Sequence, residues 1–202
     1  MFSMRVPAVL CVLSAAVAPA QTANWFQRAP AVAPAPSSSG TSLAYDSARN
    51  VVVAFLNQVR QTWIYDGRSW TQQTPAQSPV RDGSICFDSN RNVVVGVFGN
   101  QSTGLDTWEW NGSNWLVRNS GGITPRGSFM LAFDPVRNET VLFGGNDGGR
   151  SWADTWTWNG TSWTQRSTGG ATGRSDAGMT FDRQRGVMVM FGGWGPLYSQ
   201  EI

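Results

Sequence analysis

Short apolar and alternating segments recur along most of the chain, separated by turns rich in Gly, Asn and Asp. The β-branched runs at 51–53 and 93–95 are typical of strands that are buried on both faces. Trp108 and Trp110 lie two residues apart, so a strand would place both side chains on one face. Asn-Gly and Asp-Gly pairs between such segments are strong hairpin signals. The pattern therefore predicts an all-β chain of short antiparallel strands.

Two blocks of sequence repeat with nearly the same spacing. In the first block, an aromatic residue precedes an aspartate, and periods of 42, 46 and 48 residues separate Asp46, Asp88, Asp134 and Asp182. In the second block, a Thr-Trp pair recurs at periods of 45 and 48 residues, with its tryptophans at Trp63, Trp108 and Trp156. Because the two sets of anchors agree, we interpret the chain as an array of repeats about 45 residues long.

Each repeat predicts four strands, here named a to d in chain order. Strand a ends at the anchor aspartate, and a tight turn with a left-handed position leads into strand b. The residues predicted at that left-handed position are Asn50, Asn92, Asn138 and Gly186. An arginine follows each anchor aspartate by three residues, so we interpret these pairs as turn-stabilising side chains rather than catalytic carboxylates.

The repeats resemble those of the kelch family, whose β-propellers include galactose oxidase. The likeness lies in Phe-Gly-Gly at 143–145 and 191–193, in the aromatic residues of strand c and in the tryptophan that begins strand d. Repeat one departs from it with Phe-Leu-Asn at 55–57, and repeat two with Phe-Gly-Asn at 98–100. The resemblance implies a kelch-type β-propeller made of four-stranded antiparallel blades, as in exported bacterial-type members of the family.

The N-terminus has the three parts of a secretory signal. Arg5 supplies a positive charge, residues 6–18 are apolar, and small residues at 18–20 fit a cleavage site before Gln21. We therefore predict a signal peptide at 1–20 and a secreted or periplasmic mature protein; a buried N-terminal strand or helix is the alternative. The apolar run is too short to span a bilayer.

The remaining residues, 21–202, form one predicted repeat domain. Its blades are expected at about 41–73, 83–118, 127–166 and 175–202, with an isolated strand at 24–28 assigned to the last of these. This arrangement predicts a partial propeller, with three full blades and parts of a fourth, taken from a longer six- or seven-bladed ring. A closed four-bladed ring is the alternative. An incomplete ring would expose an apolar face and is expected to self-associate.

Composition removes several kinds of chemistry from the chain. It contains no His, and all 15 basic residues are Arg, so catalysis and metal binding that depend on imidazole or on lysine are excluded for this sequence. A net charge of +2 without a basic run gives no reason to expect nucleic-acid binding. We predict no catalytic residue, no metal site and no cofactor.

Alternating strand direction predicts that the d–a and b–c loops share one end of the blades. The b–c loops differ in length between repeats, and variable loops on a rigid scaffold are the usual place for binding. Arg81, Arg126 and Arg174 lie in d–a loops and are candidates for binding an anionic group. The alternative is that they cap strand ends or pair with a nearby aspartate such as Asp82 or Asp176.

Nine of the 11 tryptophans lie at repeated strand positions, where we expect them to form the core. The other two lie outside these positions. Trp152 and Trp194 fall in b–c loops, so each could stack on a sugar ring or pack its loop against a neighbouring blade. Our leading hypothesis is therefore an exported scaffold that binds a glycan or protein partner through the d–a and b–c loops. One alternative is a fragment of a galactose-oxidase-like or other carbohydrate-modifying propeller enzyme whose catalytic residues lie outside this chain. Another is a purely structural envelope component with no small-molecule ligand.

Overall fold

Every regular element in the described part of the chain is a β-strand, which confirms the predicted all-β class. The computed structural model describes residues 10–12, 26–28, 32–35, 40–100 and 104–195. The strands are β1 (Leu10–Val12), β2 (Phe26–Arg28), β3 (Thr41–Asp46), β4 (Val51–Leu56), β5 (Gln61–Tyr65), β6 (Trp70–Gln73), β7 (Gly83–Asp88), β8 (Val93–Asn100), β9 (Gly104–Trp110), β10 (Trp115–Ser120), β11 (Met130–Asp134), β12 (Glu139–Phe143), β13 (Thr155–Trp158), β14 (Trp163–Ser167), β15 (Gly178–Asp182) and β16 (Val187–Phe191).

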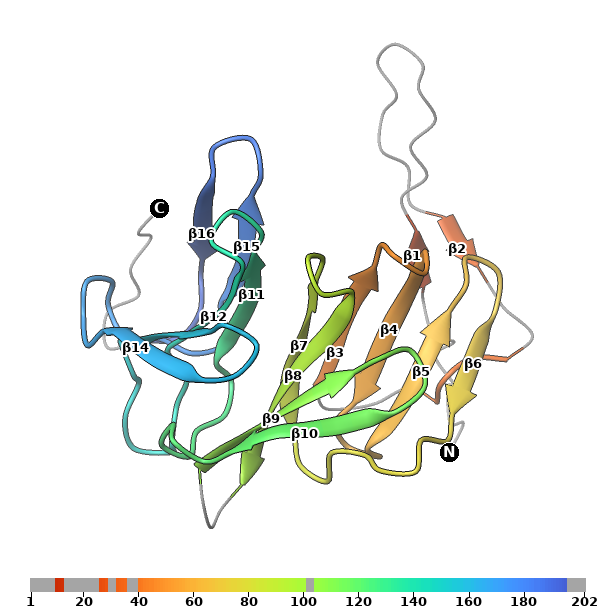
Figure 1. Ribbon diagram of the computed structural model, residues 1–202, viewed down its shortest axis with the longest axis horizontal. Helices are drawn as coiled ribbons and strands as arrows, with labels where there is room; N and C mark the ends of the chain where they lie inside the picture. The colour runs from red at the N-terminus through yellow and green to blue at the C-terminus, as the bar shows by residue number, and fades with distance from the viewer. Residues whose placement is uncertain (1–9, 13–25, 29–31, 36–39, 101–103, 196–202) are drawn as a thin grey trace, which may run out of the picture.

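Three antiparallel meanders of four strands follow one another along the chain. They are β3–β4–β5–β6, β7–β8–β9–β10 and β11–β12–β13–β14, and each strand pairs with its neighbour in sequence (Figure 1). A fourth unit consists of the hairpin β15–β16 alone within the described residues. Each four-stranded sheet corresponds to one predicted repeat, with its strands in the order a to d.

The N-terminal strands pair with each other. Only Leu10–Val12 of the predicted signal peptide is described, and this strand, β1, pairs antiparallel with β2 at Phe26–Arg28. The sequence assigned the strand at 24–28 to the blade of residues 175–202, but the structure pairs its described part with β1 instead. This partner lies much closer along the chain, so the pairing closes a far shorter loop.

Turn chemistry explains why each repeat begins with a hairpin. The backbone φ angles are 55° at Asn50, 56° at Asn92, 58° at Asn138 and 69° at Gly186, so the predicted left-handed positions are confirmed. In the first turn, Asp46 accepts hydrogen bonds from the backbone N–H groups of Ala48 and Arg49 and from the Arg49 side chain. The aspartates of the other three turns accept the same set of bonds. These pairs are therefore turn-stabilising, as the sequence predicted.

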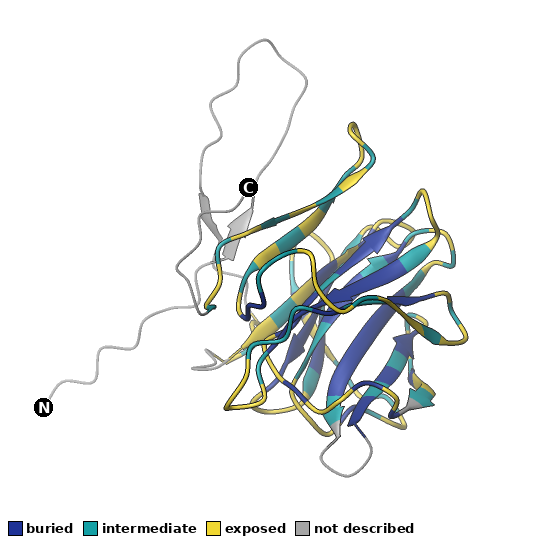
Figure 2. Ribbon diagram, turned by 90° about the vertical axis from the view of Figure 1, so that its left-hand side faces the viewer, coloured by how far each residue is buried: buried dark blue, intermediate teal, exposed yellow. Residues whose placement is uncertain are grey.

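Aromatic side chains hold neighbouring sheets together. The Trp115 indole N–H donates to Thr62 Oγ1 of the preceding sheet at 2.8 Å, and Trp163 repeats this bond to Thr107 at 2.7 Å. Phe55 and Phe98, from strands b of the first two sheets, meet edge to face with ring centroids 4.8 Å apart. Figure 2 shows the resulting interior in dark blue. The core therefore lies between successive sheets.

Strand a of each repeat lies beside strand a of the next. β3 contacts β7, β7 contacts β11, and β11 contacts β15, so each sheet contacts the next through its first strand. Since strands alternate in direction, the b–c and d–a loops of all these units emerge at one end of the molecule, here called the loop face. No helix in the described part of the chain is long and apolar enough to cross a membrane.

Candidate functional site

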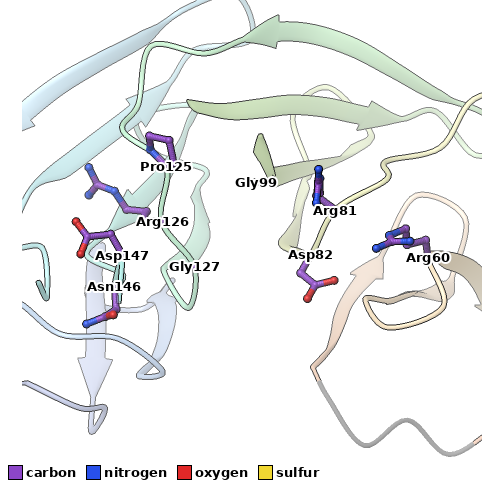
Figure 3. A pocket seen from close by; sticks show the side chains of 9 residues that line it. All are labelled: Arg60, Arg81, Asp82, Gly99, Pro125, Arg126, Gly127, Asn146 and Asp147. Carbon is purple, nitrogen blue, oxygen red and sulfur yellow. The ribbon is translucent and has the colours of Figure 1, made fainter. Parts of the chain in front are cut away.

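Loops from three successive sheets line an open pocket of about 400 Å³ on the loop face. This joint contribution confirms that the d–a and b–c loops share one end. Figure 3 shows its charged and polar side chains on two walls, with Arg60, Arg81 and Asp82 on one and Arg126, Asn146 and Asp147 on the other. The lining residues are Arg60, Arg81, Asp82, Gly99, Pro125, Arg126, Gly127, Asn146 and Asp147.

Arg126 is held rigidly at the base of its loop. Its guanidinium forms a two-pronged ion pair with Asp154, with N–O distances of 2.5 and 3.1 Å, and also donates to the carbonyls of Thr124 and Gly144. The Arg126 side chain is only 1% exposed. This geometry favours the structural alternative raised for Arg126, although its partner is Asp154 rather than Asp82 or Asp176.

The partner carboxylate is ionised in this arrangement. Burial alone would raise the pKa of Asp154, but hydrogen bonds from Arg126 and from the Trp156 indole outweigh it and lower that pKa below its ordinary value. Arg126 and Asp154 therefore form a neutral pair that joins the b–c loop of the third sheet, just before strand c, to the d–a loop that precedes this sheet. The positive charge of Arg126 is already matched within the protein.

Trp152 packs inside its own loop rather than standing clear of it. The guanidinium groups of Arg126 and Arg150 lie over its ring, 4.0 and 4.3 Å from the centroid. Its indole N–H donates to Asp147 Oδ2 at 3.1 Å. Cation–π contacts of this kind occupy the ring surface that a sugar would need. The loop-packing interpretation of Trp152 therefore accounts for its contacts better than ligand stacking does.

Arg174 repeats the backbone contacts of Arg126 one sheet later. It is buried, and its guanidinium donates to the carbonyls of Thr172 and Gly192 at 3.1 and 3.2 Å. Trp194 lies in the b–c loop of the same unit with 65% of its surface exposed, and its backbone forms two bonds with that of Ser175. Neither residue lines the pocket that contains Arg81 and Arg126.

The accessible positive charges of the pocket belong to Arg81 and to Arg60, which the sequence did not single out. Both are exposed, and neither side chain forms a hydrogen bond or ion pair with any described residue. Arg60 lies in the b–c loop of the first sheet, where its N–H bonds to the Leu56 carbonyl at 2.7 Å and its φ is 54°. An arginine in a turn position that favours glycine was the available sequence signal.

On the opposite wall, Asp147 and Asn146 are bonded within their own loop. Asp147 accepts hydrogen bonds from the backbone N–H groups of Gly149 and Arg150, and these bonds lower its pKa. Asn146 bonds through its side chain to Gly148 and Ser151 in the same loop. These bonds fix the loop, and in Figure 3 both side chains point away from Arg60 and Arg81.

Other reactive groups lie away from the pocket. Cys86 is buried in strand a of the second sheet, where burial raises the pKa of its thiol to about 12. Among the described residues, no three His, Cys, Asp or Glu side chains gather closely enough to hold a metal ion. No protein-family model matches the chain, and no curated protein matches it.

Proposed function

We propose that this chain is an exported, kelch-type β-propeller scaffold that binds a glycan or protein partner through its loop face, without catalysis. The observation that carries this proposal is the pocket formed jointly by loops from three sheets. Arg60 and Arg81 line its wall, and their side chains pair with no described residue. A site assembled from several repeats on a rigid core is typical of repeat proteins that bind partners.

The propeller assignment draws support from how the sheets repeat. Each sheet contacts the next through its first strand, and equivalent tryptophans bond equivalent threonines across both interfaces between complete sheets. In a propeller, radially repeated four-stranded sheets stack in this manner. The kelch-like sequence features lie at corresponding places in these sheets.

Blocking one end of the molecule tests whether the loop face binds the partner. Val59 and Val136 are both exposed turn valines, in a b–c loop and in an a–b turn at the opposite end. We would introduce Val59→Cys or Val136→Cys in a Cys11→Ser background and attach polyethylene glycol to the new thiol. Buried Cys86 should not react.

The labelled proteins would be applied to an array of neutral saccharides, acidic saccharides and peptides. Label at position 59 should abolish whatever binding the unlabelled protein shows, whereas label at position 136 should leave it unchanged. Equal loss from both positions, or no binding by the unlabelled protein, would contradict the proposal.

A further inference from the structure

Some arginines of the chain form ion pairs with a carboxylate, and others form none with the described residues. Seven form ion pairs within the described residues: Arg49, Arg91, Arg118, Arg126, Arg137, Arg166 and Arg185. Arg60 and Arg81 form none there, although both line the same wall of the pocket. No described carboxylate neutralises their positive charges, and both side chains lie on the same wall of the pocket (Figure 3).

The backbone at Arg60 gives an independent reason to assign it a function. Its φ of 54° is a left-handed conformation that an L-residue adopts at a cost and glycine adopts freely. The b–c loop of the third sheet uses glycine at such a conformation, with a φ of 93° at Gly148. Since the exposed Arg60 side chain bonds to no described residue, its left-handed backbone and its place on the pocket wall indicate a role in binding.

We propose that Arg60 and Arg81 bind the carboxylate of an acidic saccharide, whose hydroxyl groups donate to Asp82 on the same wall of the pocket. This inference rests on the proposed function and specifies the ligand of the same face. Guanidinium groups bind carboxylates through strong, directional hydrogen bonds. A pocket of about 400 Å³ lies within the range of small-ligand sites and suits a short saccharide segment.

The acceptor beside the two arginines favours a saccharide over an acidic peptide. Asp82 lies on the same wall as Arg60 and Arg81, and its negative charge opposes any additional carboxylate, on a saccharide or on a peptide. A saccharide with one carboxylate on each ring also carries hydroxyl groups, which can donate to the Asp82 carboxylate, whereas a glutamate peptide has no hydroxyl donor. Mixed charge in the pocket therefore matches a ligand with both an anionic group and neutral donors.

Calorimetric titration of the full chain with tetragalacturonate tests the proposal. Its methyl ester keeps the rings and their hydroxyl groups but lacks the negative charge, and tetraglutamate carries the charge on a peptide. We expect tetragalacturonate to bind, the ester to bind at least about tenfold more weakly, and tetraglutamate to bind more weakly than tetragalacturonate.

Variants identify the residues responsible. Arg60→Ala and Arg81→Ala should each raise the dissociation constant for tetragalacturonate at least about tenfold. Arg68→Ala is the matched control, because Arg68 is an exposed arginine in the turn between β5 and β6, at the other end of its sheet. Circular dichroism should show that all three variants fold, since each side chain is exposed.

Each other result overturns the proposal. The carboxylate site would be disproved if tetragalacturonate did not bind or if its ester bound equally well. An equal loss of affinity in Arg68→Ala would also disprove it. Equally tight binding of tetraglutamate would assign the pocket to an acidic peptide. The proposed function would still stand if label at position 59 blocked binding to any other array ligand, so the two failures are distinguishable.

Discussion

Arg126 and Arg81 show how two arginines in equivalent loops come to differ. The guanidinium of Arg126 turns inward to Asp154 and to two backbone carbonyls, and it is shielded from water. Arg81 finds no carboxylate among the described residues and stays exposed on the wall of the pocket. The same residue type therefore stabilises one loop and is available for binding in another.

Removing Arg126 should destabilise the protein strongly. Arg126→Ala leaves Asp154 buried without its partner, and breaking a buried pair in this way costs about 3–5 kcal/mol. Urea unfolding followed by tryptophan fluorescence measures the loss. The double variant Arg126→Met/Asp154→Leu, which removes both charges, should recover most of it. A loss below about 1 kcal/mol in Arg126→Ala would show that the pair is not important for stability.

Replacing Arg60 by glycine should stabilise the fold while weakening ligand binding. Arg60→Gly relieves the left-handed backbone at φ 54°, so we expect a gain of about 1 kcal/mol in the free energy of unfolding. Arg68→Gly is the control, since Arg68 is not among the positive-φ residues, and it should give no gain. Loss of stability in Arg60→Gly would mean that its side chain supports the loop.

At the scale of elements, the repeated a–b turn determines where each hairpin begins. One aspartate accepts two backbone N–H groups and an arginine side chain, and the residue after that arginine closes the turn in a left-handed conformation. The first turn also reaches the next sheet, because Arg49 donates to the carbonyls of Asn92 and Asn111. The turn therefore serves both its own hairpin and the interface between sheets.

These turns should make the protein sensitive to acid. Burial raises the pKa of Asp134, but hydrogen bonds from Arg137 and Val136 outweigh it, so the folded pKa lies below the ordinary value of 3.8. A lowered folded pKa contributes stability above the unfolded pKa, and this is lost as pH falls through the folded pKa. The urea concentration at the midpoint of unfolding should therefore stay constant near neutral pH and decrease once the pH drops below about 4.

The variant Asp134→Asn tests whether Asp134 contributes to the loss of stability in acid. It cannot ionise, so its deficit in stability relative to the parent should shrink as the pH drops below about 4. Unfolding curves at several pH values provide the comparison. A deficit that stays constant down to pH 2 would show that Asp134 does not contribute to acid sensitivity.

At the scale of the whole molecule, burial ends abruptly at the last hairpin. The three four-stranded sheets bury large side chains against one another, whereas β15–β16 leaves Val189 41% and Phe191 65% exposed (Figure 2). Within the described residues, the outer edge of β16 pairs with no strand. An apolar strand with an unpaired edge and no charged side chain is a template for pairing with another chain.

A second copy of this chain is the partner that we expect at this edge in solution. Light scattering coupled to size exclusion should show dimers or larger species that increase with protein concentration. Val189→Lys should shift the protein to monomer, because a charged residue on an edge strand opposes pairing. Val136→Lys, at an exposed turn, should not. A monomer at every concentration would contradict this expectation.

Sequence reasoning could identify the strands because they depend on local patterns. The Asn and Gly turn positions and the alternating tryptophans predicted the hairpins and the four-strand order, and the structure confirms both. It could not find the partner of Arg126, since Asp154 lies 28 residues away. Nor could it show that Arg150 and Asp147 engage Trp152, because these contacts depend on how one loop folds back on itself.

By itself, the sequence determined the all-β class, the repeat and the turn chemistry, since these follow from residue spacing and from intrinsic backbone preferences. Tertiary structure alone decided which charged side chains remain available. Packing of successive sheets buried Arg126 and Arg174, and it left Arg60 and Arg81 on one wall of a pocket. The physical reason is that burial and pairing of a charge depend on neighbours from distant repeats, which no local pattern specifies.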